Sequence, residues 1–149
     1  MSYTNFCIKL LLVLCLTLTL SSAQSSEESS LLKLANDPTL QWGGCPAFIG
    51  KECQIAVLHG DPAKANSDIF FKVPADFKIV NHWHTSPERM ILVSGKLDVT
   101  YKGEVTKTMT PGAYAFGPAK KPHTAFCHKG DACVIFIAFE NPIDAFEVK

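Results

Sequence analysis

Short stretches of apolar, β-branched and aromatic residues, several alternating with polar residues, follow one another from residue 54 to residue 140. Such stretches, bounded by glycine, proline, asparagine or aspartate, are typical of β-strands. The predicted strands are 54–59, 69–73, 78–84, 88–94, 97–101, 104–109, 114–116, 123–127 and 133–140. Turn residues separate them at the spacing of a jelly-roll barrel, and no long amphipathic helix, repeat or second domain interrupts the series. The pattern therefore predicts an all-β, single-domain barrel.

Two of these stretches, 90–93 and 134–139, are apolar on both faces of the strand. A strand of an antiparallel sheet normally leaves one face to water, so this pattern indicates that both faces are covered. One interpretation is that a second subunit covers the outer face, which predicts a homodimer. The other is that the N-terminal segment or the C-terminal residues around Phe146 cover it. An uncovered apolar patch would favour aggregation.

The first residues of the chain differ in composition from the rest. Residues 2–23 contain no acid and a single lysine, Lys9, followed by the apolar run 10–16 and, at the end, by the small residues Ser-Ser-Ala. This order is typical of a secretory signal peptide that is cleaved after Ala23. The apolar run is short for a membrane span.

Three parts of the chain follow: a signal peptide at 1–23, an N-terminal tail at 24–41 and the barrel domain at 42–149. In the tail, three leucines before Pro38 predict a short helical turn. Cleavage leaves 126 of the 149 residues, enough for one hydrophobic core. We expect the protein to be secreted or periplasmic, with no membrane attachment after cleavage.

The charges of the cleaved chain are almost balanced, with 13 Lys and Arg against 14 Asp and Glu. Proteins that bind nucleic acid present a strongly basic surface, and the sequence contains no basic cluster that predicts one. We therefore expect no nucleic-acid partner. A small molecule is the partner that the remaining features indicate.

The cleaved chain keeps four cysteines: Cys45, Cys53, Cys127 and Cys133. Sequence alone permits three connectivities. Pairing within each close pair is favoured because Gly and Asp between the second two predict a hairpin turn that places them on neighbouring strands. Each bridge stabilises the fold by about 2–3 kcal/mol. The alternative is that Cys127 lies on the strand face of His123 and acts as a soft metal ligand or reactive thiol.

Four residues carry the clearest chemical signal. Side chains two apart on a strand share a face, so His82 and His84 point the same way. Glu88 opens the next predicted strand after a Thr-Ser-Pro turn, and His123 follows a Gly/Pro-rich segment. Three imidazoles and one carboxylate suit iron, manganese, zinc, nickel or copper, and they leave positions for water or substrate. The predicted metal ligands are His82, His84, Glu88 and His123.

This arrangement resembles the cupin superfamily. The first cupin motif reads His-x-His, three or four residues, Glu, six residues, Gly, and the run from His82 to Gly95 matches it without a gap. The second reads Gly, five residues, Pro-x-Gly, two residues, His, three residues, Asn. Here Gly112, Pro118 and His123 fall at the right intervals. The resemblance extends over most of the chain from about residue 70 to residue 139.

Three positions depart from the cupin pattern. Lys120 replaces the glycine of Pro-x-Gly, Cys127 replaces the final asparagine, and Asp76 stands where a glycine precedes the first histidine by six residues. These departures affect loops and their flanks and leave the four ligand positions intact. The resemblance therefore implies a cupin jelly-roll barrel that binds a divalent metal ion. It implies a particular reaction less firmly.

Cupins with this ligand set include dioxygenases, oxalate oxidases, decarboxylases and isomerases. The resemblance implies a class of sites and not one reaction. The interpretation that we favour is an oxygen-dependent enzyme, a dioxygenase or oxidase, that acts on a small chelating organic substrate, with Glu88 contributing to catalysis. The alternative is a metal- or small-ligand-binding or sensory module without enzymatic activity. An internal general acid or base would separate the two, and Tyr101 and Tyr114 are candidates by residue type alone.

Overall fold

Eleven β-strands and no helix form the regular secondary structure of residues 28–149, the part of the chain that the computed structural model describes. The predicted signal peptide at 1–23 lies outside these residues. All the strands belong to one unit, Leu32–Lys149. They are β1 (Trp42–Gly44), β2 (Gln54–His59), β3 (Ser67–Val73), β4 (Phe77–Trp83), β5 (Glu88–Ser94), β6 (Leu97–Tyr101), β7 (Lys107–Met109), β8 (Tyr114–Gly117), β9 (His123–Cys127), β10 (Cys133–Phe139) and β11 (Phe146–Glu147).

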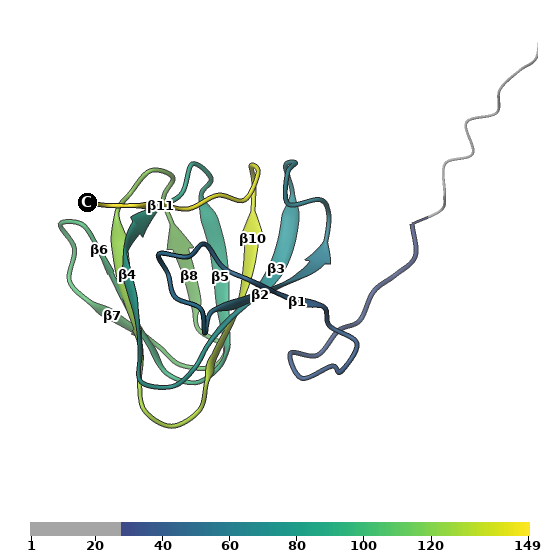
Figure 1. Ribbon diagram of the computed structural model, residues 1–149, viewed down its shortest axis with the longest axis horizontal. Coiled ribbons are helices and arrows are strands. Elements are labelled where there is room, and N and C mark those ends of the chain that lie inside the picture. Colours follow the sequence, from purple (N-terminus) through teal and green to yellow (C-terminus); the bar gives the residue numbers. More distant parts are fainter. Residues whose placement is uncertain (1–27) are drawn as a thin grey trace, which may run out of the picture. The chain divides into compact units, whose positions relative to one another are not determined.

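The strands form two antiparallel sheets that face each other around the core (Figure 1). One sheet has the order β1-β2-β3-β10-β5-β8 and the other β11-β4-β9-β6-β7. Strands distant in sequence are therefore neighbours, since β10 lies between β3 and β5, and β9 lies between β4 and β6. The predicted all-β jelly-roll fold is confirmed.

Local differences from the predicted elements occur at the ends of the sheets. Residues 42–44, which precede the first predicted strand, form the edge strand β1, in which Trp42 pairs with Ala56. Glycine is poor in a strand interior but is tolerated at such an edge. The expected helical turn before Pro38 is not a helix. Instead, Asp37 N–H donates to the Leu34 carbonyl in a single turn.

The alternation of buried and exposed residues along β5 shows how the sheets enclose the core. Glu88, Met90 and Leu92 face the interior, whereas Ile91 and Val93 are exposed. β6 and β9 show the same period of two, whereas β3 and β10 have three consecutive buried residues because part of their outer face is also covered. The main buried cluster consists of Ile49, Cys53, Ile69, Phe71, Val73, Ile79, Met90, Leu92, Leu97, Val99, Tyr101, Met109, Ala125, Cys127, Cys133, Ile135, Ile137 and Phe139.

A second apolar cluster covers part of the outer face of the larger sheet. It is formed by Ala35, Leu40, Trp42, Ala56, Leu58, Phe70, Val134 and Phe136. The N-terminal segment thus covers the outer face of β10, as one of the two interpretations expected. Exposed apolar side chains remain on β5 and β8, namely Ile91, Val93, Tyr114 and Phe116. For this remaining face, a second subunit stays a prediction.

Two disulfides join the cysteines in the favoured pairing. Cys45 is bonded to Cys53 and Cys127 to Cys133, with Cα–Cα distances of 5.5 and 5.9 Å. The segment between the second pair is not the expected hairpin, because β9 and β10 belong to different sheets. This bridge therefore ties the two sheets together. A bonded sulfur offers no thiolate, which argues against Cys127 as a soft metal ligand.

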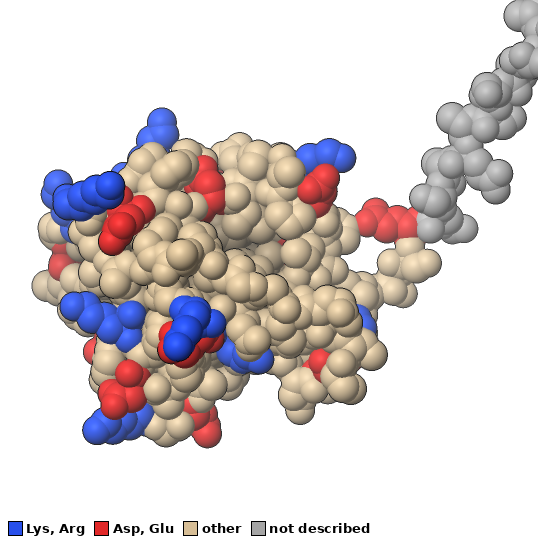
Figure 2. Space-filling view, in the orientation of Figure 1, with Lys and Arg blue, Asp and Glu red and all other residues tan. Residues whose placement is uncertain are grey.

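Charged groups of both signs are interspersed on the face of the molecule that Figure 2 shows. Several form exposed pairs, among them Arg89 with Glu140 and Lys107 with Glu104. Within residues 28–149 no helix is long and apolar enough to cross a membrane. The two disulfides indicate an oxidising compartment, because such bonds rarely persist in a reducing one.

Candidate metal centre

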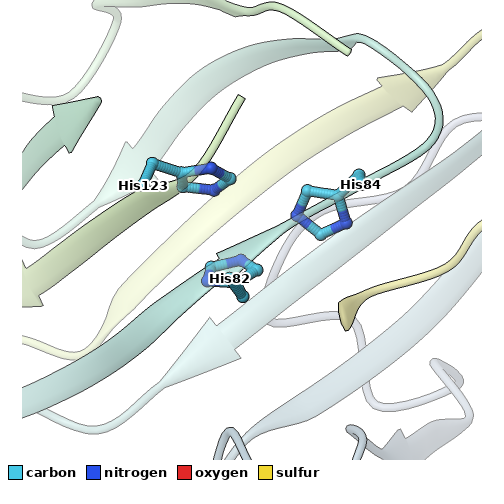
Figure 3. A group of neighbouring side chains, drawn as sticks. All are labelled: His82, His84 and His123. Carbon is cyan, nitrogen blue, oxygen red and sulfur yellow. The ribbon is translucent and has the colours of Figure 1, made fainter. Parts of the chain in front are cut away.

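The three histidines of the predicted site meet inside the barrel, at the end where β4 finishes and β9 begins (Figure 3). His82 lies in β4 and is the direct cross-strand partner of His123 in β9, while His84 follows β4 by one residue. The ring centroids of His82 and His123 are 4.2 Å apart. One ligand atom of each of the three histidines lies within 4.8 Å of the others, a cluster able to hold a metal ion.

Backbone carbonyls fix the orientation of all three imidazoles. His82 Nδ1 is 2.8 Å from the Val80 carbonyl oxygen, and His123 Nδ1 is 3.1 Å from that of Lys121. His84 Nδ1 bonds to the Asp144 carbonyl. A carbonyl oxygen only accepts, so each Nδ1 carries the proton and each Nε2 has a free lone pair. This pattern is usual for histidines that ligate metal through Nε2.

Glu88 opens β5 on the opposite sheet and projects its carboxylate toward the same cluster. Its Oε1 lies 3.4 Å from His84 Nε2, and its Oε2 lies 3.8 Å from His123 Nε2. The side chain is buried, with 4% of its surface exposed. The structure thus brings all four predicted ligands to one end of the interior.

Burial controls the ionisation of these groups. Desolvation lowers the pKa of His82 to about 4 and that of His123 to about 3, so both rings are neutral at pH 7. Desolvation also raises the pKa of the Glu88 carboxyl, an effect that His84 partly opposes. No lysine or arginine lies among the described residues that line the site, so this buried carboxylate has no permanent cation beside it. A divalent cation would supply that charge, so the donor set of three nitrogens and one carboxylate fits a transition metal ion.

Two loops next to the histidine-bearing strands adopt a backbone conformation that usually requires glycine. Lys120 and Asp76, which replace the glycines of the cupin pattern, have φ values of 59° and 60°. These are left-handed conformations, uncommon for residues other than glycine. In this conformation the Lys120 N–H donates to the His84 carbonyl oxygen at 2.7 Å. The loop geometry of the motif is thus present although the glycines are absent.

Asp144 connects the C-terminal segment to the metal cluster, and the sequence interpretation missed it. Its carbonyl accepts from His84, and its carboxylate accepts the Thr85 N–H at 2.8 Å as well as the Thr85 hydroxyl. Ser86 ties the same region together, because its buried hydroxyl accepts the N–H groups of Glu140 and Asn141, each at 3.0 Å. These contacts join residues that are 54 to 60 positions apart in the sequence, so no local sequence pattern predicts them.

The cluster lines a cavity of about 470 Å³ inside the barrel. Most of the other lining residues are apolar, and they come from both sheets. They include Ile49, Ile55, Val57, Ile69, Phe71, Ile79, Met90, Leu97, Val99, Ala125, Ile135, Ile137 and Phe139. The cavity is of the size that holds drug-sized organic molecules, about 300–1,000 Å³.

The two tyrosines considered as internal acids or bases lie in different places. Tyr101 is buried in the cavity with its ring centroid 4.8 Å from that of His123, and its hydroxyl has no hydrogen-bond partner in the described structure. Burial raises the pKa of Tyr101, and the charge of Glu88 raises it further. Tyr114 is 62% exposed on the outer face of the sheet. Only Tyr101 can contact a molecule in the cavity.

The fold is similar to that of several solved structures, one of which is a cupin barrel. One is from a study of the DMSP lyases RdDddP and RnDddQII, with a TM-score of 0.65 and 17% identity over 74% of this chain and 63% of that chain. Another is the polyketide cyclase RemF from Streptomyces resistomycificus, with a TM-score of 0.64 and 18% identity over 80% of this chain and 87% of that chain. A cupin 2 conserved barrel domain protein from Rhodopseudomonas palustris has a TM-score of 0.56 and 16% identity over 65% and 67% of the two chains.

At these identities the likeness shows the fold alone, and the chain spans less than two thirds of the length of the lyase. The family model described as Domain of unknown function (DUF4437) matches residues 24–143. Because this match covers most of the sequence, the chain belongs to that family. No curated protein matches the sequence.

Proposed function

We propose that the protein is a metal-dependent enzyme that uses dioxygen to oxidise a small organic molecule able to chelate a metal ion. The observation that carries this proposal is the cluster of His82, His84, His123 and Glu88 in the wall of a mainly apolar cavity. The solved structures of similar fold include enzymes, which supports a catalytic use of such a barrel.

The chain's own residues are suited to hold the ion and leave positions free. We assign the three Nε2 atoms and the Glu88 carboxylate as ligands. When bound, a redox-active ion such as Fe(II) or Mn(II) supplies Lewis acidity and an electron-transfer route between substrate and dioxygen. Glu88 lowers the net charge of the centre by one, and a carboxylate favours a higher oxidation state more than a neutral ligand does.

The remaining cavity residues exclude water. The walls of the cavity are mainly hydrocarbon, so a bound substrate replaces solvent around the metal-binding residues. Reactive species are thereby protected from water. The carbonyls that hold the three Nδ1–H groups keep the imidazoles in place during this exchange.

Metal analysis of protein from its native compartment, combined with oxygen uptake, tests this function. We expect one divalent ion per chain, retained by wild type and lost from the double variant His82→Ala, His84→Ala. Oxygen uptake is then measured with diols, flavonols, thiols and oxalate. A stoichiometric ion retained by the double variant would refute the metal assignment.

The variant Glu88→Gln distinguishes the role of Glu88 in metal binding from its role in oxygen-dependent turnover. Three imidazoles remain, so we expect this variant to keep much of its metal but to lose at least about tenfold in oxygen-dependent turnover. The exposed Glu52 provides the matched control, and Glu52→Gln should behave as wild type. Full activity of Glu88→Gln at equal metal occupancy would remove Glu88 from the functional ligands.

A second candidate function is a metal- or small-ligand-binding or sensory module. One observation favours it: among the described residues that line the cavity, the acids and bases besides the proposed ligands are Asp144, whose carboxylate is hydrogen-bonded to Thr85, and Tyr101, whose pKa is raised. Such a phenol is a weak base near neutral pH. Ligand binding without oxygen uptake from any substrate would favour this second function.

We also infer that the protein acts outside the cytoplasm, as a secreted or periplasmic domain released from residues 1–23. The two disulfides support this location. A homodimer through the outer face of β5 and β8 is supported by the exposed side chains of Ile91, Val93, Tyr114 and Phe116.

A further inference from the structure

His84 differs from the other two histidines of the metal cluster in what orients its ring. His82 and His123 each direct Nδ1 at the carbonyl of the residue two positions earlier in their own segment. His84 lies one residue beyond the end of β4, and its Nδ1 instead donates to the carbonyl of Asp144, 60 residues away. The orientation of this imidazole therefore depends on the C-terminal segment, residues 141–148.

The side chain of Asp144 holds the carbonyl of the same residue in place. Its carboxylate accepts the Thr85 N–H at 2.8 Å and also the Thr85 hydroxyl. Thr85 directly follows His84, so the carbonyl and the carboxylate of one residue bind two consecutive residues just after β4. Loss of the carboxylate would leave the carbonyl without this second attachment point.

Other contacts of the C-terminal segment run along the same strand. β11 pairs with the end of β4, and the rings of Trp83 and Phe146 stack with their centroids 4.5 Å apart. The Val148 N–H donates to the Asn81 carbonyl at 3.0 Å. The segment is thus docked on the strand that leads directly into His84, and it contributes no predicted ligand of its own.

Packing is the competing explanation for the orientation of the ring. His84 lies edge-on to Phe139, with ring centroids 5.8 Å apart. Packing of this kind restricts the plane of the ring but does not select which nitrogen carries the proton. A carbonyl acceptor does select it, because it accepts only from a protonated nitrogen. The contact with Asp144 therefore adds what packing does not supply.

We propose that Asp144 is a positioning residue of the metal centre: its carboxylate holds Thr85 and thereby keeps its carbonyl on His84 Nδ1, which leaves Nε2 for the ion. This inference rests on the proposed function, because it takes His84 as a metal ligand. Metal affinity then depends on the docking of the C-terminal segment, and by reciprocity a bound ion stabilises that docking.

NMR of chelator-treated protein with isotope-labelled histidine tests the positioning without metal. A buried, hydrogen-bonded Nδ1 proton exchanges slowly with water, so we expect signals from His82, His84 and His123 in wild type. The spectrum of His84→Ala assigns the one that matters. In Asp144→Ala this signal should be lost, while the other two remain and show that the variant is folded. An unchanged His84 signal in the folded variant would overturn the proposal.

Zinc affinity, measured by competition with a chromophoric chelator, tests the consequence for the site. We expect Asp144→Ala to bind zinc at least about tenfold more weakly than wild type, the lower end for loss of a residue that orients a ligand. Asp37→Ala is the matched control, because the Asp37 carboxylate also accepts the N–H and the hydroxyl of one threonine, Thr39, outside the lining of the cavity. It should bind zinc as wild type does, and equal weakening in both variants would overturn the proposal.

Asp144→Asn distinguishes hydrogen bonding from charge. The amide keeps an oxygen for the Thr85 N–H but carries no negative charge. We expect its zinc affinity to be closer to that of wild type than to that of Asp144→Ala. An affinity as low as that of Asp144→Ala would assign the effect to charge and overturn the positioning role.

Thr85→Val removes only the hydroxyl and decides the question if Asp144→Ala does not fold. We expect a weaker His84 signal and a lower zinc affinity than in wild type, and no change in either would overturn the proposal. If wild type itself does not bind zinc, the proposed metal-dependent function fails, but the signals of the metal-free protein still test the positioning. The two failures are therefore distinguishable.

Discussion

Gly117 is the position where one added methyl group tests the architecture of the site most directly. It lies on the edge strand β8, directly opposite Glu88 of β5. Its φ is outside the left-handed range, so alanine introduces no backbone strain. The new Cβ would nevertheless overlap with Tyr101 Oη and lie 3.3 Å from Tyr101 Cζ and 3.1 Å from Glu88 Oε2. A glycine is therefore present at position 117 because a larger side chain would collide with Tyr101, and not because the backbone conformation requires glycine.

The expected magnitude follows from these contacts. Overpacking in a closely packed interior costs about 1–3 kcal/mol, and we expect Gly117→Ala to lower the free energy of unfolding by that amount. Most of the overlap involves a single atom, Tyr101 Oη, which Tyr101→Phe removes. In the Tyr101→Phe background the cost of Gly117→Ala should therefore fall by at least about 1 kcal/mol, a coupling within the range for residues in contact.

Urea unfolding of the four proteins of this double-mutant cycle, followed by circular dichroism, measures the coupling. Gly44 is the matched control, because it also lines the cavity but a Cβ there meets nothing within 4 Å. Gly44→Ala should change stability by less than about 0.5 kcal/mol. If Gly117→Ala costs the same in both backgrounds, or no more than Gly44→Ala, then Gly117 does not leave space for the hydroxyl and this reasoning is wrong.

Three further tests concern stability, and a fourth concerns the disulfides. Ser86→Ala should cost about 2–4 kcal/mol in urea unfolding, because two backbone N–H groups lose their acceptor; a cost below 1 kcal/mol would contradict this. In metal-free protein, His82 and His123 have pKa values of about 4 and 3 against 6.5 when unfolded, so the unfolded chain binds more protons below pH 6.5. As the pH is lowered from 6.5 to 4, the free energy of unfolding should decrease by up to about 1.4 kcal/mol per pH unit for each histidine. The raised pKa of Glu88 partly opposes this decrease, and a flat profile would refute the prediction. Lys120→Gly should raise stability by about 0.5–1 kcal/mol by relieving a φ of 59°, and a loss of stability would exclude strain there. Denatured protein lacking its first 23 residues should show no titratable thiol without reductant, whereas two thiols would indicate one open bridge.

The strands and half of the candidate site were predictable from the sequence because they depend on local periodicity. In β6, the apolar residues Leu97, Val99 and Tyr101 alternate with polar residues in the sequence, and these three are the buried ones. In β5, residues 90–93 are all apolar, and only the structure shows that Ile91 and Val93 are exposed. The spacing of His82 and His84 by two residues is enough to place both on one side of the chain. The predicted disulfide pairing is also observed, although the hairpin from which the second bridge was predicted is absent.

Prediction was less successful wherever the answer depended on which strands are neighbours. The turn residues after Cys127 suggested a hairpin, yet this segment crosses from one sheet to the other. A local turn signal cannot distinguish the two, because both begin with the same reversal of the chain. The left-handed conformations of Lys120 and Asp76 were equally invisible, since the sequence shows only that glycine is absent there.

The sequence by itself determined the strands, their inward faces and the residue types offered to a metal. Only the tertiary structure decided that His123 pairs with His82, that the Asp144 carbonyl orients His84, and that Tyr101 keeps an unpaired hydroxyl in the same cavity. Burial and hydrogen-bond partners are set by contacts between segments up to 60 residues apart. Such contacts arise from the packing of whole sheets, and a pattern with a period of two residues carries no information about them.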